Sequence, residues 1–159
     1  MGTDGSSSDE WIELYNPSPS PVSLEGWVLR SVTDESPRIT LSGTIAAGGY
    51  YLLERTDDTT ISNIQADIAV SFGQGGLNNA GEMLVLENSR GVGMDQAGNS
   101  GAWPAGIVTP RVSMERIDVQ ASGQDASSWA SNNTILVNGT DRDGNQIRGT
   151  PRSRNSVMP

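Results

Sequence analysis

The sharpest chemical pattern in this sequence is a set of oxygen-bearing side chains at alternate positions near the C-terminus. Asp141, Asp143 and Asn145 resemble the first half of a calcium loop, in which carboxylate and amide oxygens gather around a hard cation. A full loop needs a bidentate Glu seven residues after the third ligand, and the chain has Arg152 there. Asp-Gly-Asn is also a favoured hairpin turn. We therefore favour a turn, and keep calcium binding as the alternative.

Glu13 and Arg116 are charged residues within segments that alternate like strands. A catalytic carboxylate would need a second acid in a recognisable motif or a histidine, and the sequence offers neither. We expect Glu13 to pair with Arg116 and to fix the arrangement of the strands rather than to react.

Four tryptophans could stack on sugar rings. For Trp27 and Trp129 the alternative is packing in the core, where aromatic rings bury large areas. Trp103 stands in a loop rich in Gly and Pro, so it is the ring that could be exposed to a ligand such as a glycan.

Composition excludes several classes of function. The chain has no Cys, so disulfides, thiolate metal sites and a Cys nucleophile are absent. It has no His, which removes the commonest general base and nearly all zinc sites. The net charge is −9 and every basic residue is Arg. Because an acidic surface repels phosphate backbones, nucleic acid is an improbable partner. No cofactor is expected, with calcium as the one exception.

The elements that must position these residues are short strands. Residues 1–8 predict a disordered polar tail, and residues 9–156 predict one domain. Period-two alternation with frequent Gly and Pro turns predicts about eight or nine strands and an all-β sandwich without a disulfide. Gly26 suggests a bulge within the second strand. Ile61, Ile64 and Ile68 recur at helical spacing and predict one or two helical turns. No apolar run is long enough to span a membrane.

Six motifs in order resemble the lamin tail domain family, in the form found in bacterial proteins. They are Trp11-Ile-Glu-Leu-Tyr-Asn-Pro17, Val22-Ser-Leu-Glu-Gly-Trp27, Ile45-Ala-Ala-Gly-Gly-Tyr-Tyr-Leu-Leu53, the hairpin Gly81 to Asp95, Ser113-Met-Glu-Arg116, and Trp129 with the ending Gly149 to Asn155. The resemblance implies an immunoglobulin-like sandwich. One departure is Arg152, which replaces the family's usual Gly after Gly-Thr-Pro.

The resemblance also implies structural roles and a function. The residues to which it gives structural roles are Trp11, Glu13, Asn16, Gly26, Trp27, Arg116, Trp129, Gly149, Pro151 and Asn155. We expect a non-catalytic module that contacts a protein partner or a neighbouring domain of the same polypeptide. Its setting would be a larger bacterial protein, secreted or at the cell surface. The alternative is an extracellular module that binds calcium or carbohydrate through Asp141, Asp143 and Trp103.

Overall fold

The computed structural model describes residues 2–99 and 101–159, and this part of the chain forms eleven β-strands and no α-helix. The strands are β1 (Trp11–Tyr15), β2 (Val22–Ser23), β3 (Val28–Ser31), β4 (Arg38–Thr40), β5 (Thr44–Ile45), β6 (Tyr50–Arg55), β7 (Ile68–Val70), β8 (Leu84–Glu87), β9 (Gly93–Ala97), β10 (Met114–Arg116) and β11 (Trp129–Ser131). A single 3-10 turn, η1 (Ala126–Ser128), precedes β11. Over the same residues, no helix has the length and apolar character that crossing a bilayer requires.

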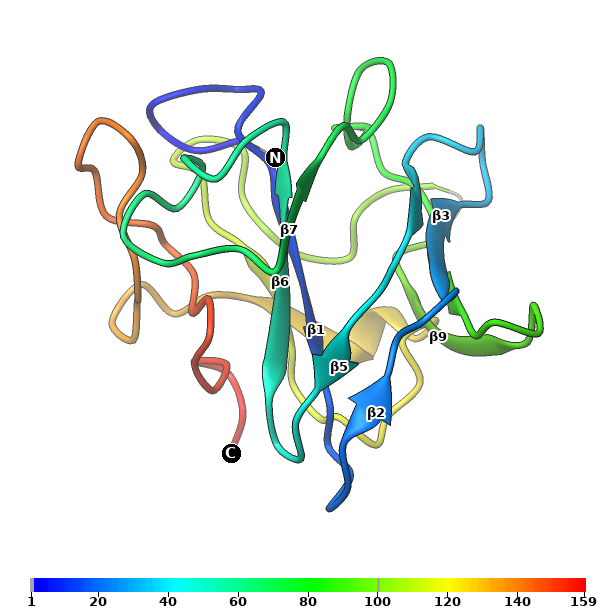
Figure 1. Ribbon diagram of the computed structural model, residues 1–159. Coiled ribbons are helices and arrows are strands. Elements are labelled where there is room, and N and C mark those ends of the chain that lie inside the picture. Colours follow the sequence, from blue (N-terminus) through cyan, green and yellow to red (C-terminus); the bar gives the residue numbers. More distant parts are fainter. Residues whose placement is uncertain (1, 100) are drawn as a thin grey trace.

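Two sheets face one another across the core. One has the order β1-β6-β7 and the other the order β4-β3-β8-β9, while β2–β5 and β10–β11 form two small pairs. Figure 1 shows β1 and β6 running together through the middle of the molecule, with β3 and β9 to one side. All pairings between the strands are antiparallel except that of β6 with β7. The predicted all-β, immunoglobulin-like sandwich is confirmed.

Gly26 explains part of the difference between eleven strands and the eight or nine predicted. It adopts a φ of +72°, a left-handed conformation that favours glycine. The Trp27 amide donates to Leu24 O at 2.9 Å, closing a turn at this point. The second predicted strand is therefore divided into β2, which pairs with β5, and β3, which pairs with β4 and β8. Gly26 marks a change of sheet rather than a bulge.

The main core lies between the two large sheets. Its buried members come from both sheets and from the loops that join them: Leu24, Leu29, Ile39, Leu41, Ile45, Tyr51, Leu53, Phe72, Leu77 and Leu84. Trp27 packs against this cluster while half-buried. Alternation of side chains along β3 and β6 places these apolar residues on the inner faces, as the period of two requires.

A second core lies on the opposite face of the β1-β6-β7 sheet. Leu52, Ile61 and Ile147 form it, with Trp11 packed beside them. Leu52 and Leu53 are neighbours in β6, so they point to opposite faces, yet neither is exposed to solvent. The chain after β11 and the loop after β6 thus add a third layer to the sandwich.

The predicted helical turns at Ile61, Ile64 and Ile68 do not form a helix. Residues 56–64 form bends and turns instead, and Ile68 begins β7. Glu54 draws this loop inward, because its carboxylate accepts the amides of Thr60 at 3.0 Å and Ile61 at 3.2 Å. The periodic isoleucines reflect burial of Ile61 and Ile64 in the second core, not helical geometry.

Candidate functional site

The candidate calcium loop is built as a turn around Asp141. Asp141 Oδ1 accepts the amides of Asp143 at 3.0 Å and Asn145 at 2.8 Å, and Oδ2 accepts the Gly5 amide at 2.8 Å. Burial acts to raise the pKa of Asp141, but these bonds and the Asn145 side chain outweigh it and hold the pKa below its usual value. No group of three or more acidic, His or Cys side chains that could hold a metal occurs in residues 2–99 and 101–159.

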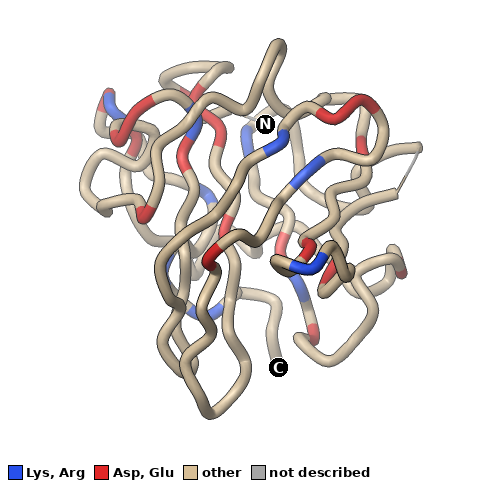
Figure 2. The backbone as a smooth tube through the Cα atoms, turned by 45° about the vertical axis from the view of Figure 1, so that its right-hand side comes forward, with Lys and Arg blue, Asp and Glu red and all other residues tan. Residues whose placement is uncertain are grey.

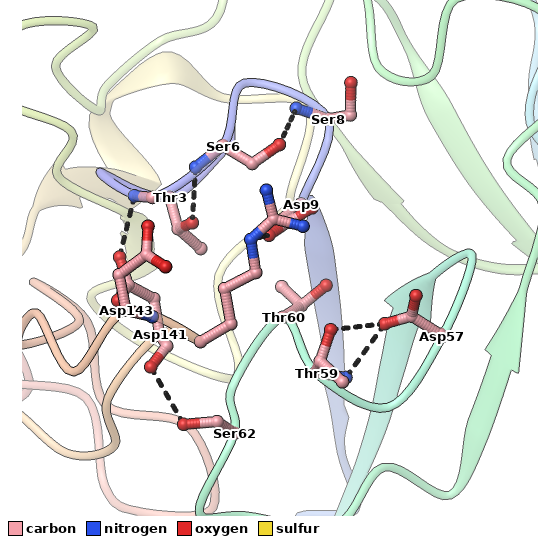
Figure 3. A network of polar contacts seen from close by, with 12 residues as sticks. Thr3, Ser6, Ser8, Asp9, Asp57, Thr59, Thr60, Ser62, Asp141 and Asp143 are labelled. Carbon is pink, nitrogen blue, oxygen red and sulfur yellow. Dashed lines mark hydrogen bonds and ion pairs between the residues drawn. The ribbon is translucent and has the colours of Figure 1, made fainter.

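The N-terminal loop closes over this turn, as Figure 3 shows. Besides the Gly5 bond, Asp4 pairs with Arg148 at 2.6 Å and Asp9 with Arg142 at 3.5 Å. Thr3 is only 4% exposed. The polar residues of this loop thus have partners in and around the Asp141 turn, and the disordered tail expected for residues 1–8 stays a prediction.

Glu13 and Arg116 do not pair with each other. Glu13 Oε2 accepts the Arg152 amide at 2.7 Å, and burial raises the pKa of Glu13 to about 8. Arg152 has a φ of +58°, which is the left-handed conformation that favours glycine. Its guanidinium is held by Asp67 at 2.5 Å and by Gln65 O at 3.0 Å.

Arg116 instead joins β10 to β9. Its guanidinium bonds Asp95 at 2.8 Å and Ala121 O at 2.7 Å, and it lies 4.5 Å from the centre of the Trp129 ring. The indole N–H of Trp129 donates to Gly123 O at 3.0 Å. The prediction of a Glu13–Arg116 pair fails because the two residues lie on strands that do not pair, and each finds a local partner.

Glu115 ties the C-terminal segments together, and the sequence analysis did not single it out. It is 4% exposed, and Oε1 accepts from the Asn132 side chain at 2.7 Å and from the Thr150 hydroxyl at 2.9 Å. Oε2 accepts the Ser156 amide at 2.8 Å and its hydroxyl at 2.7 Å. Beside it, the Asn155 side chain donates to Arg116 O at 2.9 Å. The Ser-Met-Glu-Arg motif gives the position of Glu115 but not its partners, which come from three other segments.

The remaining motif residues have structural roles. The Asn16 amide group donates to three carbonyls, those of Ser20, Ile45 and Ala46. A Cβ at Gly149 would lie 2.8 Å from the Trp11 ring, so only glycine fits there. Pro151 is fully buried.

A cleft of about 1040 Å³ is a candidate binding site, and all four tryptophans line it. Its walls come from β1, β8, β9 and β10, and apolar atoms predominate. Trp103 is half-buried against the main core, and its N–H donates to Asn78 O at 2.7 Å. The structure therefore places Trp103 as a wall of the cleft rather than as an exposed loop ring.

Other buried carboxylates lie outside this cleft and bond to loop amides. Glu10 Oε2 accepts the Leu77 amide at 2.9 Å, and Glu82 Oε1 accepts the Asn78 amide at 2.9 Å. Burial raises the pKa of Glu82 and raises that of Glu54 to about 7. Charged residues of both signs are otherwise distributed over the molecule, as Figure 2 shows. The hydrogen bonds from the buried carboxylates to loop amides hold those loops in place.

Comparison with known families agrees with this architecture. The model of the family described as Lamin Tail Domain matches residues 1–101, well over half of the chain. That match covers β1 to β9 and ends before β10, so the resemblance of the later motifs stays a prediction. A search of curated proteins found no match. With its immunoglobulin-like sandwich and this family match, the chain belongs to the lamin tail domain family.

Proposed function

We propose that this domain is a non-catalytic interaction module that positions a protein partner or a neighbouring domain. Its setting would be a larger bacterial protein that is secreted or displayed at the cell surface. The observation that carries the proposal is the apolar cleft lined by β1 and β9, in a fold whose family is immunoglobulin-like and non-enzymatic. Surface loops and sheet edges are the usual contact surfaces of such folds.

The charges that line the cleft support binding rather than reaction. Asp95 is paired with Arg116, and Asp4 is paired with Arg148. Glu115 accepts several hydrogen bonds within the C-terminal segments. Glu13 also lines the cleft and has a pKa raised to about 8, but its carboxyl group accepts the Arg152 amide. General acid–base catalysis needs a titrating group that can reach a substrate, and each of these carboxyl groups already has a partner within the fold. The net charge of −9 also opposes DNA, so we expect no retarded band in a gel shift at physiological salt.

Cross-linking within the full-length parent protein tests the proposal. A carboxylate-reactive dihydrazide suits the chain, which has 19 acidic residues and no Lys. We expect links from Asp4 and Asp95 at the cleft to a neighbouring domain or a bound protein, and fewer from Asp57 and Asp58, which do not line it. Absence of any such links, together with independent tumbling of this domain in the parent, would contradict the proposal.

A calcium- or carbohydrate-binding role is the second candidate. The tryptophan rings that line the cleft favour a glycan as the ligand. Calcium is less favoured, because both carboxylate oxygens of Asp141 already accept amide hydrogens. Titration calorimetry with calcium and with a glycan panel separates the two candidates from protein binding. Heat from a glycan that is lost in Trp103→Ala would favour this role.

A further inference from the structure

Strand β1 has one paired edge and one free edge. It pairs only with β6, in the register Ile12↔Leu53 and Leu14↔Tyr51. In the same register, the Arg55 amide donates to Glu10 O at 2.9 Å and the Asn16 amide donates to Gly49 O at 3.0 Å. Hydrogen-bonded pairs alternate in an antiparallel ladder, so residues 10, 12, 14 and 16 are the ones bonded to β6.

The backbone groups of the intervening residues therefore point away from β6. Trp11, Glu13 and Tyr15 each present an N–H and a C=O to the free edge, and none of these groups has a hydrogen-bond partner among the described residues. All five residues of β1 line the cleft, and four of them are half-buried. Unpaired backbone groups at a partly buried edge are a template for another strand.

The side chains around this edge suit an extended peptide with alternating apolar residues. Ile12 and Leu14 reach the main core from β1, and Leu86 reaches it from the opposite wall. Met114 adds a fourth half-buried apolar side chain from β10. A strand lying along β1 would direct alternate side chains toward this surface.

Charge indicates which peptide would fit. Of the four arginines that line the cleft, Arg116 and Arg148 are paired with Asp95 and Asp4. Arg111 and Arg154 form no ion pair within residues 2–99 and 101–159. Burial raises the pKa of Glu13 to about 8, so this carboxyl is mostly uncharged at neutral pH. Glu115, the remaining carboxylate of the lining, is buried and accepts hydrogen bonds from Asn132, Thr150 and Ser156. The cleft thus offers two available cations on a protein whose net charge is −9.

We propose that the cleft binds an extended acidic polypeptide segment, which adds as a strand to the free edge of β1 and places its carboxylates near Arg111 and Arg154. This inference rests on the proposed interaction function and names the partner's chemistry. A second copy of the chain fits less well, because its own β1 edge also lies within a cleft and it carries the same net charge of −9. Strand addition supplies affinity through main-chain hydrogen bonds and specificity through alternate side chains.

Peptide titration of the isotope-labelled chain by NMR tests the proposal. The probe is acetylated Glu-Val-Thr-Val-Thr-Val-Glu, with a Lys-for-Glu version and a version with central Pro as controls. We expect the probe to shift the amides of Trp11, Glu13 and Tyr15, and to bind about tenfold more tightly than the Lys peptide. The Pro peptide should bind weakly, because it lacks a central backbone donor.

Two variants at one position isolate the backbone contribution. Tyr15→Pro removes an N–H from the free edge of β1, whereas Tyr15→Ala keeps it. Both variants lose the Tyr15 ring, whose centre lies 5.0 Å from the centre of the Tyr50 ring. We expect about tenfold weaker binding for Tyr15→Pro and a change within about threefold for Tyr15→Ala. If Tyr15→Pro unfolds in urea melts, the double variant R111E/R154E decides, because it should prefer the Lys peptide.

Three results would overturn the inference: equal binding of the Glu and Lys peptides, shifts confined to residues outside β1, or the same shifts produced by dimerisation without peptide. If no peptide binds but the cross-links in the full-length parent are still found, only this inference fails. If no peptide binds and no cross-links are found either, the proposed interaction function also fails.

Discussion

At the scale of single residues, buried carboxylates act as ties for loop amides. Glu54 holds the loop at Thr60 and Ile61, and Glu13 holds the amide of Arg152. The sequence predicted that Glu13 is structural but gave the wrong partner. The partner of Glu13 lies far away in the sequence and depends on how the loops fold back onto the sheet. The alternation of polar and apolar residues within one strand does not contain that information.

The raised pKa values give the pH dependence a definite sign. The pKa of Glu13 is about 8 and that of Glu54 about 7 in the folded protein, against an ordinary value of 4.5. The folded state therefore holds protons that the unfolded state releases, and its stability falls as pH rises from about 5 to about 9. At about 1.4 kcal/mol for each pH unit between the unfolded and folded pKa of each group, we expect the free energy of unfolding in urea melts to fall by roughly 8 kcal/mol across that range.

Glu13→Gln measures how much of this fall in stability with rising pH is due to Glu13. Gln keeps an oxygen for the Arg152 amide but does not titrate, so the pH profile should become shallower, with the part due to Glu54 remaining, and the variant should exceed the parent in stability at pH 9. A wild-type profile that is flat or that rises with pH would contradict the prediction.

Arg152 combines backbone strain with side-chain bonds. Arg152→Ala keeps the unfavourable φ of +58° and loses the bonds to Asp67 and Gln65. Arg152→Gly loses the same bonds but relieves the strain, so it should be more stable than the Ala variant by about 1 kcal/mol. Equal stability of the two variants in urea melts would show that the backbone is not left-handed here.

At the scale of elements, β6 is the strand on which both cores depend. Leu53 faces the main core, Leu52 faces the second core, and neither is exposed to solvent. The alternation of polar and apolar residues predicted most strands, because one face of each is buried. The same reasoning failed for the loop at Ile61, where burial in a third layer imitated helical spacing.

Leu52→Ala and Leu53→Ala should each destabilise the protein by about 2–5 kcal/mol, because each leaves a cavity in a closed core. Ile135→Ala is the control, since that side chain is 81% exposed and should cost less than about 0.5 kcal/mol. A near-neutral Leu52→Ala in chemical denaturation would mean that the outer face of the β1-β6-β7 sheet is not covered.

At the scale of the whole molecule, two segments that are far apart in the sequence meet. The N-terminal loop lies against the Asp141 turn (Figure 3), through the Gly5 amide and the Asp4–Arg148 ion pair. The fold class and family could be predicted from strand patterns and ordered motifs. The contacts of residues 2–8 could not, because their partners lie more than 130 positions away in the sequence.

Deleting residues 1–8 should therefore lower the free energy of unfolding by about 1–3 kcal/mol, since Asp141 and Arg148 lose their partners. Asp4→Ala in the full chain breaks only the Arg148 pair and should cost less than about 1 kcal/mol. Unchanged thermal and urea midpoints after the deletion would show that this loop does not contribute to the fold.

The central claim is that the sandwich keeps one edge of β1 open within a cleft. Residue-resolved amide hydrogen exchange of the free protein measures this directly. The account predicts that Ile12 and Leu14, bonded to β6, exchange about 100-fold more slowly than Trp11, Glu13 and Tyr15. Equal protection of all five amides would contradict it, because a second strand would then already occupy the free edge.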